Sequence, residues 1–192
     1  MLYRFCRACV QLLCKIFFNI EVQGKETIPK NKALIVASNH ISLLDPIVVG
    51  AAFPSRLYFL AKEELFKNKL FSLLIKNLGA VPLKRDKTDV AAMKIALKLL
   101  KQGKSLLIFP EGGRGELKSV KAGVGFLAQK SSAPVVVARV FGTEEALPRG
   151  AKRIRCTKVK IVFDSLANID REESYETISH KVLEKIKRLV YH

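Results

Sequence analysis

The sequence predicts an α/β sandwich, in which helices cover both faces of a largely buried sheet. Short, nearly continuous apolar runs, typical of buried strands, alternate along the chain with segments whose apolar residues recur at helical spacing. The chain has 192 residues, the usual size of one domain, and no linker, internal repeat or low-complexity tract divides it. We therefore expect one domain, built around one sheet.

The expected strands share β-branched or other apolar runs of four or five residues. They cover residues 33–37, 57–60, 106–109, 135–138 and 159–163. The expected helices share apolar residues spaced three or four positions apart, and they cover residues 64–78, 89–102 and 174–190. In sheets of this class, binding sites form in the loops beyond the carboxyl ends of the strands, so polar clusters in those loops are the candidate site.

The first twenty residues form a separate segment that is apolar except for a narrow polar stripe. The stripe holds Arg4, Arg7, Gln11 and Lys15. A membrane-spanning helix needs about 20 apolar residues with few charges, and three cations interrupt this run. We expect residues 1–20 to form an amphipathic helix at a membrane interface, with its cations at anionic headgroups, and residues 21–192 to form the main domain. Packing of this helix on the protein core remains the alternative.

The chain is strongly basic, with 34 Lys and Arg, 17 Asp and Glu, and a formal net charge of +17. Such a charge favours nucleic acid, an anionic membrane surface or acidic and phosphorylated small partners. Aromatic residues make up only 8% of the chain and are not interleaved with the cations as in proteins that stack single-stranded bases. We expect no nucleic-acid partner, although a basic binding module without enzymic activity remains the alternative class.

The first polar cluster lies directly after the expected strand that ends at residue 37. It contains His40, whose side chain is the natural proton acceptor near neutral pH, and Asp45, which is available to fix its tautomer. Pro46 predicts a helix start, with Asp45 as its N-cap. A structural cap at Asp45 and a buried, hydrogen-bonded His40 are the alternatives to a catalytic pair.

The sequence has no recognisable enzyme nucleophile. It contains no Gly-x-Ser-x-Gly elbow, and no cysteine follows an expected strand in such a loop. No set of cysteines and histidines has metal-ligand spacing, so we expect no metal. A base without a nucleophile indicates that His40 deprotonates a substrate hydroxyl for direct attack on an activated acyl or phosphoryl group.

Two further clusters offer groups that suit a phosphate. After the expected strand 106–109, Glu111 and Gly112 precede Arg114 in a glycine-rich loop, and Lys121 follows near a helix start. Glycines allow the backbone to approach an anion, and a guanidinium can bind phosphate through two hydrogen bonds. Arg85, after residues 79–84, is another candidate contact. Each cluster alone is also compatible with an ordinary charged surface turn.

In their order and spacing, these clusters resemble the conserved blocks of the glycerolipid acyltransferase family, and most closely the 1-acyl-glycerol-3-phosphate (lysophosphatidic acid) acyltransferases. The resemblance covers roughly residues 20 to 150. Residues 39–45 are similar to the NHxxxxD block, and residues 62–85 to the second block. Residues 109–114, with the sequence FPEGGR, are similar to the FPEG-T-R block, and residues 134–143 correspond to the fourth.

The resemblance implies a single-domain αβα sandwich of the glycerolipid acyltransferase type and a role for each residue. His40 would be the general base, oriented by Asp45. Arg85, Arg114 and Lys121 would hold the acceptor phosphate, and Glu111 and Gly112 would complete the acceptor site. The donor would be a fatty acyl thioester of acyl carrier protein or coenzyme A, with no other cofactor, and the acceptor lysophosphatidic acid.

The resemblance also implies a peripheral protein on the cytoplasmic face of the cell membrane. Gly113 stands where the family usually has Thr, and Val137 stands where the fourth block usually has Pro. Neither departure touches the expected base and its carboxylate. Both bear on substrate preference, so glycerol-3-phosphate or another lysolipid remains the alternative acceptor.

Overall fold

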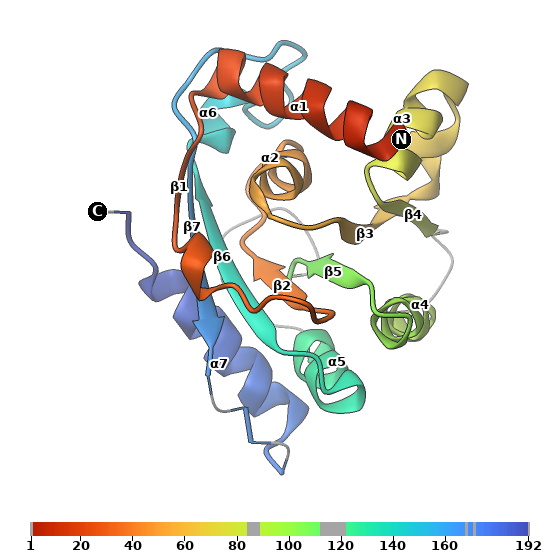
Figure 1. Cartoon of the computed structure of the whole chain (residues 1–192), viewed down its shortest axis with the longest axis vertical. Helices are drawn as coiled ribbons and strands as arrows, with labels where there is room; N and C mark the ends of the chain where they lie inside the picture. The colour runs from red at the N-terminus through yellow and green to blue at the C-terminus, as the bar shows by residue number, and fades with distance from the viewer. Residues whose placement is uncertain (1, 84–88, 112–121, 168, 171, 192) are drawn as a thin grey trace.

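The structure is a computed structural model, which describes residues 2–83, 89–111, 122–167, 169–170 and 172–191. Within these residues, seven strands form one sheet in the order β1-β7-β6-β2-β5-β3-β4 (Figure 1). The strands are β1 (Glu21–Gln23), β2 (Ile35–Ser38), β3 (Leu57–Lys62), β4 (Ala80–Leu83), β5 (Ser105–Ile108), β6 (Val135–Phe141) and β7 (Lys160–Leu166). Neighbouring strands pair in parallel, except that β6 and β7 are antiparallel.

Helices cover both faces of the sheet, as the sequence predicts (Figure 1). One face packs against α1 (Leu2–Phe18) and α2 (Asp45–Ala52), and the other against α4 (Asp89–Lys101), α5 (Gly123–Ser131) and α7 (Tyr175–Arg188). Each face of the sheet has its own hydrophobic core, and side chains of β2 alternate between them. Val36 packs in the core beneath α1 and α2, whereas Ile35 and Ala37 pack in the core beneath α4, α5 and α7. This arrangement confirms the αβα sandwich.

The smaller elements lie at the edges of this framework. They are α3 (Lys69–Asn77), α6 (Thr143–Ala146) and the 3₁₀ turns η1 (Lys25–Thr27) and η2 (Glu63–Phe66). The helix expected over residues 64–78 is therefore two elements, because the side chain of Asn68 caps α3 by accepting from the Phe71 amide at 3.0 Å. The edge strands β1 and β4 are also additions to the expected set. Both are short, and Pro82 in β4 has no amide to donate.

The N-terminal helix exists as predicted, but part of its polar stripe faces the protein. Arg7 donates to the carbonyls of Phe53 and Pro54, and Gln11 donates to the Ala51 carbonyl at 2.8 Å. These carbonyls lie at and just beyond the end of α2, where backbone acceptors lack helical partners. The expectation that Arg7 reaches lipid headgroups is therefore wrong.

The packing of α1 leaves much of its apolar surface exposed. Cys14 and Phe18 are buried in the core beneath the helix, whereas Phe5 is 68% exposed. None of the helices in the described part of the chain combines the length and the apolar character needed to cross a bilayer. The helix thus lies along the protein with its polar stripe partly inward.

Candidate active site

The candidate site lies where three central parallel strands end. β2 lies between β5 and β6, with Ala37 paired to Ile108 and Ser38 paired to Ala138. Because the three strands run in the same direction, the segments that follow them emerge at one edge of the sheet. The sequence-distant residues 39–45, 109–111 and 142–147 therefore lie together there.

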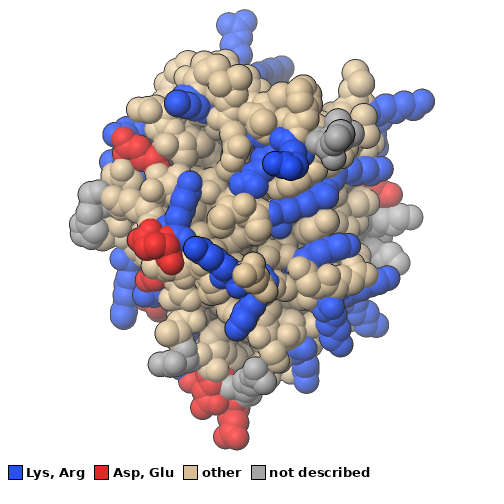
Figure 2. All heavy atoms as spheres, in the orientation of Figure 1, with Lys and Arg blue, Asp and Glu red and all other residues tan. Residues whose placement is uncertain are grey.

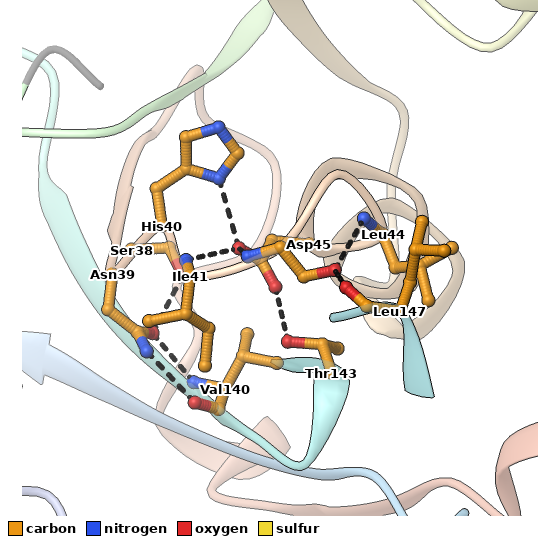
Figure 3. A network of polar contacts seen from close by, with 10 residues as sticks. Ser38, Asn39, His40, Ile41, Leu44, Asp45, Val140, Thr143 and Leu147 are labelled. Carbon is orange, nitrogen blue, oxygen red and sulfur yellow. Dashed lines mark hydrogen bonds and ion pairs between the residues drawn. The ribbon is translucent and has the colours of Figure 1, made fainter. Parts of the chain in front are cut away.

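His40 and Asp45 form the ion-pair geometry expected of a general base and its orienting carboxylate. His40 Nδ1 lies 3.0 Å from Asp45 Oδ2 (Figure 3). The Asp45 side chain is fully buried, whereas the imidazole is 16% exposed. Since a carboxylate only accepts, the proton lies on Nδ1, and Nε2 is left as the proton acceptor. In Figure 3 that second nitrogen points away from Asp45.

Asp45 does not have the N-cap position that Pro46 led us to expect. Leu44 is the N-cap of α2, and Asp45 is the first helical residue. Its Oδ2 instead accepts from the amides of Ile41 and Ser42, each at 2.7 Å. The carboxylate turns back towards the loop and stabilises it, which allows helical geometry to begin before the proline. That N-cap prediction is wrong.

Thr143 completes the coordination of the Asp45 carboxylate. Its hydroxyl donates to Asp45 Oδ1 at 2.6 Å, and its side chain is fully buried. Thr143 lies in the segment that resembles the fourth block, and the resemblance implies no role for it. A threonine after a strand carries no signal of its own, and only the adjacency of β6 and β2 brings it to Asp45. The carboxylate thus has a hydrogen-bond donor on each oxygen.

Further hydrogen bonds join the His40 loop to β6 and to the segment after it. The Asn39 amide donates to the Val140 carbonyl at 2.9 Å and accepts from the Val140 amide at 2.8 Å. The Ser42 hydroxyl donates to the Leu147 carbonyl at 3.3 Å. Asn39 and Ser42 are both buried. These contacts tie the loop to β6 and the segment after it, so the fold itself holds His40 and Asp45 in place.

The segment after β5 contributes an aromatic ring and a carboxyl group. The Phe109 ring stacks on the His40 imidazole, with centroids 4.1 Å apart and planes inclined by 20°. Neither carboxyl oxygen of Glu111 has a hydrogen-bond partner among the described residues, although both are shielded from solvent. Burial, and then the negative charge of Asp45, raise the pKa of Glu111 from 4.5 to about 7. Glu111 therefore lies close enough to Asp45 to feel its charge.

The other predicted site residues are not placed. Arg85, Gly112, Arg114 and Lys121 lie outside the described residues, so their proposed contact with a phosphate stays a prediction. Among the residues that are described, no group of three His, Cys, Asp or Glu side chains has the arrangement of a metal site. The described part of the site therefore consists of the His40–Asp45 pair, the Phe109 ring and the Glu111 carboxyl group.

Comparison with known proteins places this fold and site in a family. The family model described as Acyltransferase matches residues 19–140, which include His40 and Asp45 but not Thr143 or Leu147. The chain is 27% identical to the 1-acyl-sn-glycerol-3-phosphate acyltransferase of Bacillus subtilis, over 98% of this chain and 96% of that protein. It is 32% identical to the chloroplastic acyltransferase BAT2 of Brassica napus, over 86% of this chain and 52% of the relative.

A solved structure has the same fold. The crystal structure of the 1-acyl-sn-glycerophosphate (LPA) acyltransferase PlsC from Thermotoga maritima superimposes with a TM-score of 0.73. The match has 26% sequence identity and covers 99% of this chain and 83% of the other. Sequence motifs, family model and fold agree. The chain belongs to the acyltransferase family and is an O-acyltransferase.

Proposed function

We propose that the protein transfers a fatty acyl group from an acyl thioester to the free sn-2 hydroxyl of 1-acyl-glycerol-3-phosphate, which gives phosphatidic acid. The observation that carries this proposal is the contact of His40 Nδ1 with the buried Asp45 carboxylate at 3.0 Å. It leaves Nε2 of a partly exposed imidazole free to accept a proton. The relatives named as acylating this lysolipid support the choice of acceptor.

In this proposal, His40 takes the proton of the acceptor hydroxyl as the oxygen attacks the thioester carbonyl. The carbon–oxygen bond forms, the tetrahedral intermediate collapses, and the carbon–sulfur bond breaks. The proton on His40 passes to the departing thiolate, so the enzyme returns to its starting state. Asp45 holds the ring in the required tautomer and stabilises the imidazolium that forms. No covalent acyl-enzyme is needed.

Acceptor recognition is assigned to the residues around the base. Glu111 would bind the glycerol portion of the acceptor, because its carboxyl group is unpaired among the described residues and lies near Asp45. Arg85, Arg114 and Lys121 would hold the phosphate, with Gly112 giving the backbone room to approach it. The acyl donor would be a thioester of acyl carrier protein or coenzyme A.

We also propose that the protein works at a membrane surface, which it contacts through the exposed apolar side chains of α1 and α3, here called the apolar face. Leu70 of α3 is 82% exposed, and α3 lies against α1 (Figure 1). The other members are Phe5, Leu12, Leu13, Ile16 and Phe17 of α1, with Phe71, Leu73 and Leu74 of α3. Exposed apolar patches of this kind mark interaction sites, and a lipid substrate must be reached from a membrane.

The direct test is incubation of the purified full chain with lysophosphatidic acid and a labelled acyl thioester, with lipid product and free thiol measured together. We expect equal amounts of both. Parallel reactions with acyl carrier protein and coenzyme A thioesters identify the donor, and reactions with glycerol-3-phosphate identify the acceptor. Thiol release without lipid product, or product only with an acceptor that lacks phosphate, would overturn the proposal.

A further inference from the structure

A cationic segment between α6 and β7 is not used by the proposed reaction. We define it as residues 149–158, which hold Arg149, Lys152, Arg153, Arg155 and Lys158 and no acidic residue. Lys158 pairs with Glu21 at 2.5 Å. The other four cations are exposed and form no ion pair with any described residue. Their charges are therefore available to an external partner.

Backbone hydrogen bonds hold the cationic segment beside the end of α1. The Thr157 amide donates to the Phe17 carbonyl at 3.1 Å, and the Val159 amide donates to the Phe18 carbonyl at 2.8 Å. Two residues before Thr157, the Arg155 amide donates to the Ala146 carbonyl of α6 at 2.8 Å. Figure 1 shows the segment as the light blue loop next to α1. It therefore borders the helix that carries much of the apolar face.

The cationic segment itself has the composition of a segment that lies at a membrane interface. Ile154 lies among the cations and is exposed, as are Ile16 and Phe17 on the adjoining end of α1. Apolar side chains of a surface-bound protein enter the boundary between headgroups and acyl chains, while Lys and Arg lie at the level of the headgroups. The cationic segment fits this arrangement, because its cations surround the exposed Ile154 and lie next to the apolar face.

We infer that the cationic segment binds the phosphates of anionic lipid headgroups and makes membrane association selective for anionic bilayers. This inference rests on the proposed membrane association of the apolar face. Figure 2 shows that Lys and Arg are spread over the visible surface with few acidic side chains among them, so net charge alone does not single out a partner. The position of the cationic segment indicates a lipid partner, because the segment adjoins the apolar face. An acidic carrier protein could also bind these charges, and it is separated from a lipid surface by its effect on activity.

The test compares two variants of the full chain that lose equal charge at different places. The segment variant carries Arg149→Gln, Lys152→Gln, Arg153→Gln and Arg155→Gln. The control variant carries Lys94→Gln, Lys98→Gln, Lys101→Gln and Lys130→Gln, which are exposed residues of α4 and α5, on the opposite face of the sheet from α1. Co-sedimentation is measured with vesicles of phosphatidylcholine alone and of phosphatidylcholine mixed with phosphatidylglycerol.

We expect the segment variant to lose about tenfold or more of its affinity for the mixed vesicles, since each cation near an anionic surface strengthens binding severalfold. Its affinity for neutral vesicles should stay near that of the wild type, and the control variant should lose much less on either. Equal losses in the two variants would overturn the inference while leaving the apolar face as the membrane site. Failure of the wild type to bind either vesicle would overturn membrane association itself.

The alternative that the cationic segment binds acyl carrier protein is tested by measuring acyl transfer to lysolipid dispersed in detergent, where no bilayer is present. The segment variant should turn over acyl carrier protein and coenzyme A thioesters at wild-type rates. A loss confined to the carrier-protein thioester, with vesicle binding unchanged, would assign the segment to the carrier and overturn the inference. Circular dichroism of both variants checks that the fold is retained.

Discussion

The hydroxyl of Thr143 lies 2.6 Å from Oδ1 of Asp45, across 98 positions of the chain. This bond occupies the carboxylate oxygen that His40 does not use, because His40, Ile41 and Ser42 all direct their donors to Oδ2. A buried carboxylate needs hydrogen bonds on both oxygens to compensate for lost hydration. The orientation of the His40–Asp45 pair therefore depends on the first residue of α6 as well as on its own loop.

Thr143→Val should lower kcat about tenfold with little change in KM, because the valine keeps the shape but leaves Asp45 Oδ1 without its donor. Thr143→Ser should keep most of the activity, since it restores the hydroxyl. In an Asp45→Asn background, Thr143→Val should have little further effect on kcat. Steady-state kinetics of the single and double variants measure this. Independent, multiplying effects of the two substitutions would contradict the role in positioning Asp45.

His40→Ala should lower kcat by about 10²–10⁴-fold or more, the range supplied by a positioned general base. The imidazole stacks on Phe109 at the surface of the site and is partly exposed, so the fold should survive its removal. Acyl transfer and thermal unfolding are measured on the same preparation. A folded variant with near wild-type turnover would refute proton abstraction by His40.

Asp45→Asn should lower kcat by roughly a thousandfold, because an amide no longer selects the productive tautomer of His40. It should also lower the free energy of unfolding by about 1–3 kcal/mol, since an NH₂ group must face at least one of the donors that the carboxylate accepts from. Chemical denaturation and steady-state kinetics separate the two effects. An active variant with reduced stability would leave Asp45 as a purely structural residue of the loop.

Glu111 should make stability fall with rising pH. Its pKa in the folded protein is about 7 against 4.5 for an ordinary glutamate, so the folded state binds the proton more tightly than the unfolded chain. The resulting stabilisation is complete below pH 4.5 and is lost as pH rises through about 7. Glu111→Gln removes this dependence.

The unfolding free energy of the wild type, minus that of Glu111→Gln, should therefore decrease between about pH 4.5 and pH 7 and change little above pH 8. Urea denaturation of both proteins across this range measures the difference. Using the difference cancels the contributions of the other titrating groups. Parallel stability curves for the two proteins would show that burial does not perturb Glu111.

Much of this arrangement could be predicted from the sequence, because it follows from local pattern. The helical and strand periodicities predicted the sandwich. The spacing of His40 and Asp45 left a pair and a structural role open, and the resemblance to the NHxxxxD block predicted the pair. Contacts between distant residues have no local signal in the sequence. The hydrogen bonds from Thr143 to Asp45 and between Asn39 and Val140 form only because β6 lies next to β2. Arg7 likewise turns towards the protein because α2 ends beside it, and the residue pattern of α1 carries no information about the end of α2.

Gly142 is the residue that lets the chain turn from β6 into Thr143. Its φ is +84°, and a Cβ at this position would lie 2.3 Å from the backbone carbonyl oxygen of Lys158. Gly142→Ala should therefore lower the free energy of unfolding by about 2–4 kcal/mol, from backbone strain together with overpacking against an atom that cannot rotate away.

Gly103→Ala is the matched control, because Gly103 also has a positive φ, +74°, but a Cβ there meets nothing within 4 Å. It should cost only the backbone strain, about 1 kcal/mol. Any Gly142→Ala protein that folds should also have a reduced kcat, since Thr143 would be displaced from Asp45. Equal destabilisation by the two substitutions, with full activity in both, would show that the turn at Gly142 does not constrain the site.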